Sequence, residues 1–389
     1  MEFFKEGAYG CVFRPGMNCF GEKENSKFIT KIQMDKETSD NEITIGRFIE
    51  NEVKKDIPFY EDLFAPIISS CSIDLGKIEN ENVKKCEIVQ KNNDATIKFV
   101  SNKIRYVGKY TLEPFLKTEF QSNIQIFYKH FFQSHKYLLN SLHILSNYNI
   151  IHYDLKQNNI SIDDSKRIPV IIDFGLSFQF NDLTTDLHYE KYFYVYYDKY
   201  PPWCLEITII SFIVQEFKNI EDLHKTIRQN TKLKMKERTK LFKQEMIEKE
   251  KKRERGEKNW RNSVIDIEHL VNIIDHYFKY NYIIIEIKNK VIVEKAKEEW
   301  IKFVKKEFQD KTGEYIVRFL MKSWKTWDNY SLCVIYFSLF RSFFSDKKKQ
   351  KKFMPYQQLL IDNIIALPLN RDESIDTTTK LNILIDIDE

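Results

Sequence analysis

Four polar side chains in the middle of the chain have the types and the spacing that phosphoryl transfer requires. The sequence reads HYDLKQNNI and then, after ten further residues, IIDFG. Phosphoryl transfer needs a carboxylate that accepts or orients the proton of an attacking hydroxyl, and oxygen ligands that hold Mg²⁺ against a triphosphate. Asp154 suits the first task, and Asn159 and Asp173, five and nineteen residues further on, suit the second. Lys156 lies two residues after Asp154, where its positive charge can neutralise the negative charge that builds on the transferred phosphoryl group.

Short strands and one long helix are predicted around these residues. The apolar runs NIIHYDL and PVIIDFGL predict buried strands on either side of the polar loop. The stretch 128–148 is predicted as a helix whose core face carries four leucines: Leu138, Leu139, Leu142 and Leu145. A strand–loop–strand hairpin with incidental polar residues is the alternative for the whole pattern, and the specificity of two linked motifs argues against it.

The N-terminal part reads as a small sheet region with one helix. Residues 1–35 predict strands separated by turns, one of them at Pro15–Gly16, and alternation over 86–107 predicts further strands. Apolar residues at helical spacing over 40–55, with Asp40 or Asn41 as the cap, predict a helix. A small mixed sheet followed by a largely helical region indicates the α+β class.

The pattern H-x-D-L-K-x-x-N followed by D-F-G resembles the eukaryotic-type protein kinase family. The resemblance implies a bilobal kinase-like fold, with a small β-rich N-lobe and a larger, mostly helical C-lobe. It implies that Asp154 is the catalytic base, that Lys156 steadies the phosphoryl group, and that Asn159 and Asp173 bind the metal. ATP with Mg²⁺, or Mn²⁺ in its place, is the implied cofactor, and lysine after the catalytic aspartate favours Ser/Thr hydroxyls of protein substrates.

Motifs of the kinase N-lobe can be followed in order. Gly7-Ala8-Tyr9-Gly10-Cys11-Val12 resembles the second half of the glycine-rich loop, whose first glycine would fall at Lys5. Gly7 and Gly10 would let the backbone close over the nucleotide beside Val12. The strand FITKI resembles the one whose lysine, here Lys31, holds the α- and β-phosphates.

The family pairs that lysine with a glutamate on the next helix. Glu42 is the first choice, eleven residues after Lys31, with Glu50 and Glu52 as alternatives. The segment that links the lobes and would bind adenine through its backbone is expected near 104–108.

The C-terminal half carries two further kinase-like motifs. Trp327-Asp328-Asn329-Tyr330-Ser331 resembles the start of the family's central buried helix, in which the aspartate anchors the catalytic-loop backbone. Pro368-Leu369-Asn370-Arg371 resembles the segment whose arginine forms a buried ion pair with a glutamate that closes the activation segment. Glu206 is the matching glutamate.

These motifs imply an N-lobe over 1–108 and a C-lobe over 109–389, with 207–320 as a charged helical insertion. The residues GAYGCVF, the missing first glycine and YPPWCLE are most similar to kinases of large DNA viruses. Tyr153 stands where the family has an arginine that gathers an activation-loop phosphate, so we expect activity without such phosphorylation.

Composition bounds the class of protein and its partners. The chain has 389 residues, 42% of them hydrophobic, which is enough for a substantial core. Its net charge of +4 is too small to hold nucleic acid by itself. The stretch 228–262 is rich in both positively and negatively charged residues, which is typical of a solvated helix. Its basic residues leave a contact with nucleic acid open.

Cysteines and apolar runs predict the compartment. The six cysteines lack zinc or disulfide spacing, so reduced thiols in a cytosol-like compartment are expected. The N-terminus lacks a signal-peptide pattern, and the longest apolar stretch, Ser331–Phe344, is too short to span a bilayer. We therefore predict a cytoplasmic protein with no membrane partner, placed in the host cytoplasm, a viral factory or the virion if it is viral.

Two other functions remain open from the sequence. One is a catalytically weak or inactive pseudokinase scaffold that acts through its insertion. The other is a kinase of small molecules with the same ancestral fold, which would keep H-x-D-x-x-x-x-N but generally lack D-F-G.

Overall fold

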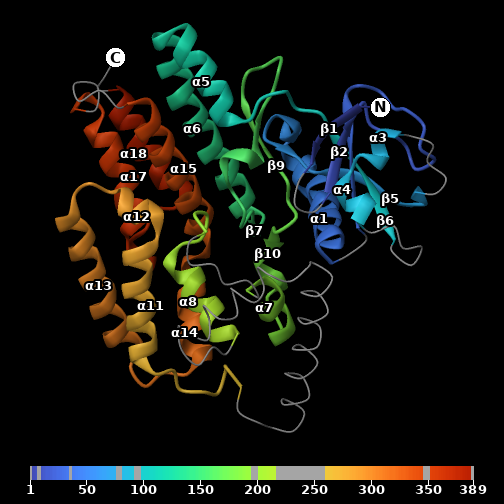
Figure 1. Ribbon diagram of the computed structural model, residues 1–389. Helices are drawn as coiled ribbons and strands as arrows, with labels where there is room; N and C mark the ends of the chain where they lie inside the picture. Colours follow the sequence, from blue (N-terminus) through green and yellow to red (C-terminus); the bar gives the residue numbers. More distant parts are fainter. Residues whose placement is uncertain are drawn as a thin grey trace. The chain divides into compact units, whose positions relative to one another are not determined.

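Five strands near the N-terminus form an antiparallel sheet in the order β1-β2-β3-β6-β5. Strands β1, β2, β5 and β6 are labelled in Figure 1. The strands are β1 (Glu2–Glu6), β2 (Gly10–Arg14), β3 (Phe28–Met34), β5 (Ile67–Ile73) and β6 (Phe99–Arg105). In β3, Lys31 lies opposite Val12 of β2 and Asn102 of β6. Side chains directly opposite each other share a face of the sheet, so these three residues form one row.

The computed structural model describes residues 2–6, 10–34, 37–75, 81–91, 98–193, 200–215, 259–344 and 351–386. The chain divides into two units, Met1–Gln179 and Phe180–Glu389. The lobe boundary predicted at residue 108 lies inside the first unit.

The predicted helix over 40–55 is present in three consecutive pieces, but it begins at Glu37, so the cap predicted at Asp40 or Asn41 is wrong. The pieces are α1 (Glu37–Phe48), a π-helical turn (Ile49–Val53) and α2 (Lys54–Asp56). The backbone of α1 approaches β5 closely at Gly46, where an added Cβ would lie 2.5 Å from the carbonyl oxygen of Ile67. Only glycine allows this approach, which sets the distance between helix and sheet.

The prediction of strands over residues 86–91 is wrong. This stretch contains the helix α4 (Glu87–Lys91), which follows α3 (Glu81–Lys84). Five residues of mixed polarity are too few for their periodicity to separate a strand from a helical turn. The alternation further on is correct, because β6 begins at Phe99.

Short strands and two helices complete the first unit and frame the polar loop. A three-stranded sheet has the order β4-β9-β8, and β10 pairs with β7. The bounds are β4 (Phe64–Ala65), β7 (Ile150–Ile151), β8 (Ile160–Ile162), β9 (Pro169–Ile172), β10 (Phe178–Gln179), α5 (Leu112–Ser122) and α6 (Ile124–Asn147). The predicted helix over 128–148 is confirmed as α6, and its four leucines are buried. The Asn123 side chain caps α6 by accepting from the N–H groups of Gln125 and Ile126.

The described part of the second unit is helical. Its helices are α7 (Asp186–Tyr192), α8 (Leu205–Val214), α11 (Ile267–Tyr280), α12 (Tyr282–Glu286), α13 (Lys290–Phe308), α14 (Gly313–Leu320), α15 (Trp327–Phe343), α17 (Met354–Ile365) and α18 (Ser374–Asp386). The described residues within 207–320 belong mainly to helices with buried faces, and α8 is buried throughout. Most of the charged stretch, 228–258, lies outside the described residues.

The longest apolar stretch of the sequence forms part of a buried helix. Ser331–Phe344 falls in α15 and its C-cap, and α15 packs beside α17 (Figure 1). The hydroxyl groups of Tyr330 in α15 and Tyr277 in α11 are 2.6 Å apart. Among the described helices, we find none that combines the length and the hydropathy of a bilayer-spanning segment.

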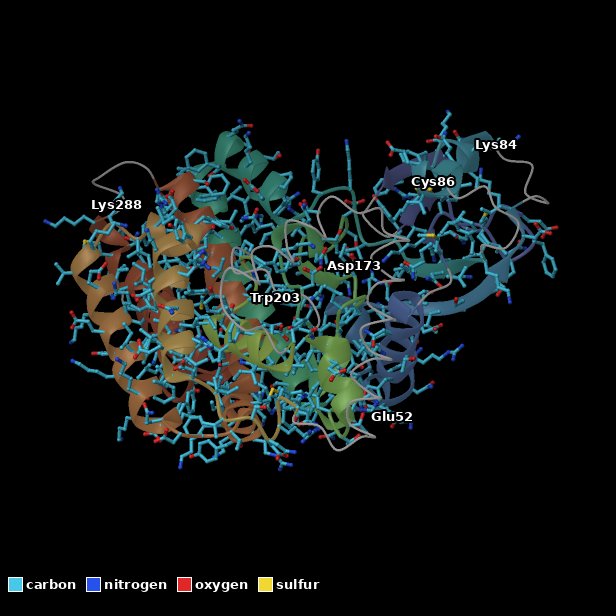
Figure 2. All side chains as sticks on the ribbon, turned by 60° about the horizontal axis from the view of Figure 1, so that its bottom comes forward. Glu52, Lys84, Cys86, Asp173, Trp203 and Lys288 are labelled. Atoms are coloured by element: carbon cyan, nitrogen blue, oxygen red, sulfur yellow. A yellow bond between two sulfur atoms is a disulfide. The ribbon has the colours of Figure 1, made fainter. Side chains whose placement is uncertain are left out.

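The expectation of reduced thiols throughout is wrong for four of the six cysteines. Disulfide bonds join Cys11 to Cys86 and Cys19 to Cys71, with Cα atoms 6.0 Å apart in both pairs (Figure 2). The partners are 75 and 52 residues apart in sequence, so local spacing gave no sign of them. Both bonds lie within the small sheet region. They tie β2 to the residue before α4, and the loop after β2 to β5.

Candidate functional site

Lys31 lies between two carboxylates. Its Nζ is 2.8 Å from Glu42 Oε2 and 3.1 Å from Glu42 Oε1, and 3.0 Å from Asp173 Oδ1. The side chains of Lys31 and Glu42 are 13% and 4% exposed, whereas that of Asp173 is 40% exposed. The Lys31–Glu42 contact is thus shielded from water, and Asp173 (labelled in Figure 2) keeps an open side.

The fold brings these three residues together from separate elements. The register of β3 puts Lys31 in the row with Val12 and Asn102, and α1 presents Glu42 over the sheet. Asp173 directly follows β9, and its backbone φ of 66° is left-handed. Such a conformation costs about 1 to 3 kcal/mol in a residue other than glycine, so the surrounding contacts hold it in place.

Asn41, next to Glu42, connects α1 to the segment after Asp173. Its Nδ2 donates to the carbonyl oxygen of Ser177 at 2.5 Å and to that of Gly175 at 3.3 Å. These bonds keep the glutamate and the aspartate that contact Lys31 in fixed positions relative to each other.

The electrostatics of the cluster favour charged Lys31 and Asp173. Burial opposes a charge on Lys31, but Glu42 and Asp173 outweigh burial and raise the pKa of Lys31 above its ordinary value. Burial also opposes ionisation of Asp173, yet Lys31 lowers the pKa of that carboxyl below its ordinary value. For Glu42, burial raises the pKa, and the attraction of Lys31 works against that rise. A lysine held charged beside an ionised carboxylate can bind a phosphate group.

Asp154, Lys156 and Asn159 form a second cluster within one loop. Lys156 Nζ is 2.8 Å from Asp154 Oδ2 and 3.1 Å from Oδ1. Asn159 Nδ2 donates to the carboxylate of Asp154 at 3.0 Å and to its carbonyl oxygen at 2.9 Å. Asp154 is buried, so these donors hold its carboxylate in one orientation.

The backbone around this loop is tied down on both sides. His152 is fully buried, and its Nε2 is 3.2 Å from the carbonyl oxygen of Ile172. Ser177 Oγ donates to the carbonyl oxygen of His152 at 3.0 Å. Tyr153 has a left-handed φ of 67°, and its ring packs on Phe178 at 5.3 Å. These contacts fix the loop that carries Asp154 relative to the segment after β9 that carries Asp173.

The donor set fits a hard cation such as Mg²⁺ at the predicted residues. Because Asn159 uses its amide nitrogen toward Asp154, its Oδ1 is left without a partner among the described residues, and so is Asp173 Oδ2. Mg²⁺ is commonly held by one or two such oxygens together with substrate phosphates and water. In the described part of the chain, no cluster of three or more His, Cys, Asp or Glu side chains forms a protein-only metal site.

The predicted glycine-rich loop is described only in part. Gly7 lies outside the described residues. Gly10 begins β2, where an added Cβ would lie 2.4 Å from the carbonyl oxygen of Ile32, so only glycine fits. Val12 lies directly opposite Lys31 and shares its face of the sheet.

The predicted linking segment, 104–108, offers a free backbone donor. The N–H of Tyr106 donates to the carbonyl oxygen of Lys27 at 2.8 Å, and the carbonyl oxygen of Val107 accepts from Asp164 N at 3.3 Å. Within the described ranges, the N–H of Val107 has no acceptor.

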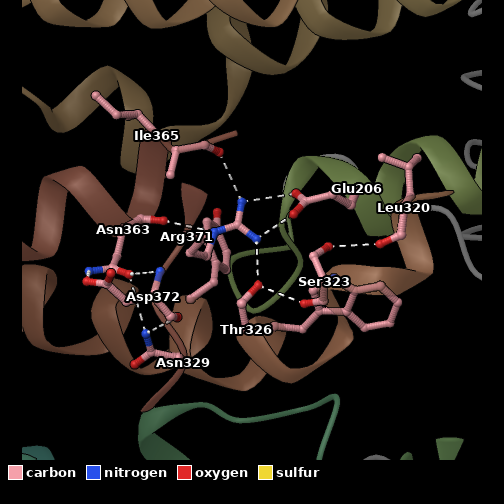
Figure 3. A network of polar contacts seen from close by, with 12 residues as sticks. Glu206, Leu320, Ser323, Thr326, Asn329, Asn363, Ile365, Arg371 and Asp372 are labelled. Carbon is pink, nitrogen blue, oxygen red and sulfur yellow. Dashed lines mark hydrogen bonds and ion pairs between the residues drawn. The ribbon is translucent and has the colours of Figure 1, made fainter. Parts of the chain in front are cut away.

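In the second unit, the predicted contact between Glu206 and Arg371 is confirmed. Arg371 Nη1 and Nη2 lie 2.5 Å and 3.0 Å from the two carboxylate oxygens of Glu206 (Figure 3). Asp328 is buried at the start of α15. Its predicted bonds to the catalytic-loop backbone stay a prediction.

The structure also decides between the three glutamates proposed as the partner of Lys31. Glu42 contacts Lys31, whereas Glu50 bonds Tyr60 and Lys54, and Glu52 bonds Lys55. Sequence reasoning missed the roles of Asn41 and Gly46, whose only signal was their position on the helix that carries Glu42.

Comparison with known proteins adds no family assignment. No protein-family model matches the chain, and no curated protein matches its sequence.

Proposed function

We propose that this protein is an ATP-dependent protein kinase with a bilobal, kinase-like fold. The observation that carries the proposal is the position of Lys31 Nζ between Glu42 and Asp173, in the same unit as the Asp154–Asn159 loop. A buried lysine oriented by one glutamate and paired with a partly exposed aspartate is the arrangement that binds nucleotide phosphates in protein kinases.

Asp154 is the group that receives the substrate hydroxyl. A carboxylate oriented by Asn159 can accept a hydrogen bond from that hydroxyl and take its proton as the new bond to phosphorus forms. Lys156 Nζ, now 2.8 Å from Asp154, supplies a positive charge close to the reacting groups. The resemblance to serine/threonine kinases rests on this lysine.

Asn159 Oδ1 and Asp173 Oδ2 are the oxygens that would hold Mg²⁺, or Mn²⁺ in its place. When bound, the metal ion would neutralise negative charge on the phosphate groups of the nucleotide. Asp173 keeps its carboxylate ionised for this task because Lys31 lowers its pKa.

The adenine ring would lie against the linking segment. The N–H of Val107 is available as a hydrogen-bond donor to a base. Val107 also belongs to an apolar cluster that offers a surface for a flat ring: Ala65, Val107 and Val170, with Ile104 and Ile172 packed against them. Backbone donors beside apolar walls are common in nucleotide sites.

The finer assignments come from the sequence resemblance. We propose Ser/Thr hydroxyls of proteins as acceptors, membership of the kinases of large DNA viruses, and a place in the host cytoplasm, a viral factory or the virion. Tyr153 in place of arginine supports activity without activation-loop phosphorylation.

Transfer from radiolabelled ATP tests the proposal. The full chain is incubated with [γ-³²P]ATP, Mg²⁺, a mixed protein acceptor and free small alcohols. Asp154→Asn is measured beside it, together with a Lys129→Ala control on the exposed face of α6. We expect label on Ser or Thr, at least a hundredfold less with Asp154→Asn, and an unchanged rate with Lys129→Ala. Label that enters only small alcohols would indicate a small-molecule kinase. Absence of transfer, with ATP still raising the melting temperature, would indicate the pseudokinase alternative.

A further inference from the structure

A cavity of about 390 Å³ opens between α6 and the turn that joins β8 to β9. The helix contributes His130, Gln133 and Tyr137, which recur at the spacing of one helical face. The turn contributes Arg167 and Ile168. None of these residues belongs to the Lys31 or Asp154 clusters, so this is a separate feature of the first unit.

The cavity carries polar groups that the chain leaves unused. Lys136 also lines it, and neither Lys136 nor Gln133 has a hydrogen-bond or ion-pair partner among the described residues. Arg167 donates one hydrogen bond, from Nη2 to Glu119, and its guanidinium lies over the ring of Phe115 at 4.9 Å. A guanidinium has five donors, so Arg167 retains several for a ligand.

The carboxylates near the cavity do not neutralise it. Glu119 is shared between Arg167 and His130, whose Nδ1 is 3.1 Å away. Lys136 is therefore a cation without a carboxylate of its own. An anionic group is the ligand chemistry that matches this charge.

Two further carboxylates lie close to Tyr137 but have their own cations. Asp62 pairs with Lys166 at 2.5 Å, and Asp163 pairs with Arg105 at 3.5 Å. Together with burial, these carboxylates raise the pKa of Tyr137 to about 12. Its hydroxyl thus stays protonated and donates to the carbonyl oxygen of Asp62 at 3.0 Å.

The remaining wall of the cavity is apolar. The ring of Tyr137 and the side chains of Ile168 and Pro169 supply it. A simple inorganic anion would leave this surface bare, whereas a ligand that joins an acidic group to an apolar body would use both parts.

We propose that this cavity binds an acidic peptide segment, with a Leu or Phe side chain against Ile168 and a carboxylate against Lys136 and Arg167. Pro169 begins β9, and Asp173 directly follows that strand. Four residues of extended chain span roughly 13 Å, so a docked peptide lies within a short linker of the catalytic residues. The use of this cavity as a docking site for protein substrates rests on the proposed kinase function. The binding of an acidic peptide to the cavity does not.

Peptide binding is tested without nucleotide. The probe is a fluorescein-labelled peptide of alternating Asp and Leu, and fluorescence anisotropy is measured on the full chain at low salt. The two comparison peptides alternate Asp with Ser, to remove the apolar part, and Lys with Leu, to reverse the charge. We expect measurable affinity for the Asp–Leu peptide and at least tenfold weaker binding of either comparison peptide.

Two variants on one helix locate the binding. Lys136→Glu should weaken Asp–Leu binding at least tenfold, whereas Lys129→Glu, the same charge change at an exposed position of α6 outside the cavity, should not. Ile168→Ser should weaken it through the apolar part. Melting temperatures equal to that of the parent show that the variants are folded.

Three results would overturn the proposal. One is equal weakening by the two lysine variants, which would indicate attraction to general surface charge. Another is equal affinity for the Asp–Leu and Asp–Ser peptides, and the third is no binding of the Asp–Leu peptide. If binding is as expected but Asp154-dependent phosphate transfer is absent, the kinase proposal fails and the binding site stands.

Discussion

Glu206 and Arg371 are 165 residues apart in the sequence and form a buried, two-point ion pair. Their side chains are 0% and 1% exposed. Arg371 Nε also donates to the carbonyl oxygen of Asn363 at 3.0 Å, and Nη1 donates to Thr326 Oγ1 at 3.3 Å (Figure 3). The pair joins the start of α8 to the segment between α17 and α18, and its charges depend on each other because water cannot reach them.

Removing one partner of this pair should destabilise the protein strongly. Arg371→Leu leaves Glu206 buried without its cation, and the expected loss is about 3 to 5 kcal/mol in the free energy of unfolding, measured by urea denaturation. Arg318→Leu is the matched control, because Arg318 is exposed and its bond to Glu314 spans one helical turn; it should cost less than about 1 kcal/mol. Equal losses for both arginines would show that the Glu206–Arg371 pair contributes no more than a surface contact.

Gly46 should be irreplaceable on the helix that carries Glu42. A Cβ at this position would lie 2.5 Å from the carbonyl oxygen of Ile67, and backbone cannot rotate away as a side chain can. Gly46→Ala should therefore push α1 away from β5. We expect it to lower the free energy of unfolding by about 1 to 3 kcal/mol and to weaken ATP binding. Thr44→Ala, at an exposed position of α1, should change neither quantity. Calorimetric titration with ATP and Mg²⁺ makes the comparison, and unchanged ATP affinity in Gly46→Ala would refute the argument.

Asn41 should act on nucleotide affinity through the Asp173 segment. In Asn41→Ala the carbonyl oxygens of Gly175 and Ser177 lose their hydrogen-bond donor. Such a loss typically lowers the free energy of unfolding by about 1 to 3 kcal/mol. Because Asp173 is then held less firmly, we expect ATP–Mg²⁺ to bind several-fold more weakly. The neighbouring substitution Asp40→Ala, at an exposed position, is the control. A loss of stability with full ATP affinity would assign Asn41 a structural role alone.

Reduction of the disulfides should lower the stability of the small sheet region. Cys11–Cys86 and Cys19–Cys71 close loops of 75 and 52 residues in sequence separation. In the chain-entropy model each contributes roughly 4 kcal/mol. The melting temperature should therefore fall when dithiothreitol is added. A variant with all four cysteines changed to Ser should melt at the lower temperature and not respond to the reductant, whereas a parent protein indifferent to reductant would contradict the bonds.

His135 should make stability depend on pH. Burial lowers the pKa of His135 to about 3, below its usual 6.5. As the pH falls below 6.5, His135 becomes protonated in the unfolded chain but stays neutral in the folded chain. The free energy of unfolding therefore decreases with pH until about pH 3. Between pH 7 and pH 5 this amounts to about 2 kcal/mol. His135→Leu should remove that part of the pH dependence in urea titrations, and parallel losses in variant and parent would exclude His135 as the cause.

The sequence determined the parts of the site that lie close together along the chain. Asp154, Lys156 and Asn159 fall within six residues, so their contacts follow from one loop. The helix α6 was readable because its leucines repeat at helical spacing over several turns. The mixed α+β class followed from the change of periodicity between the two halves of the chain.

Contacts between elements that are distant in the sequence became visible in the folded chain. Three glutamates were compatible with Lys31, and the folded chain brings Glu42 into contact with it. The four paired cysteines gave no local signal, because each disulfide joins segments that meet only in the folded sheet. Local patterns report how a segment buries its own side chains, whereas pairing across 50 or more residues depends on packing that no single segment contains.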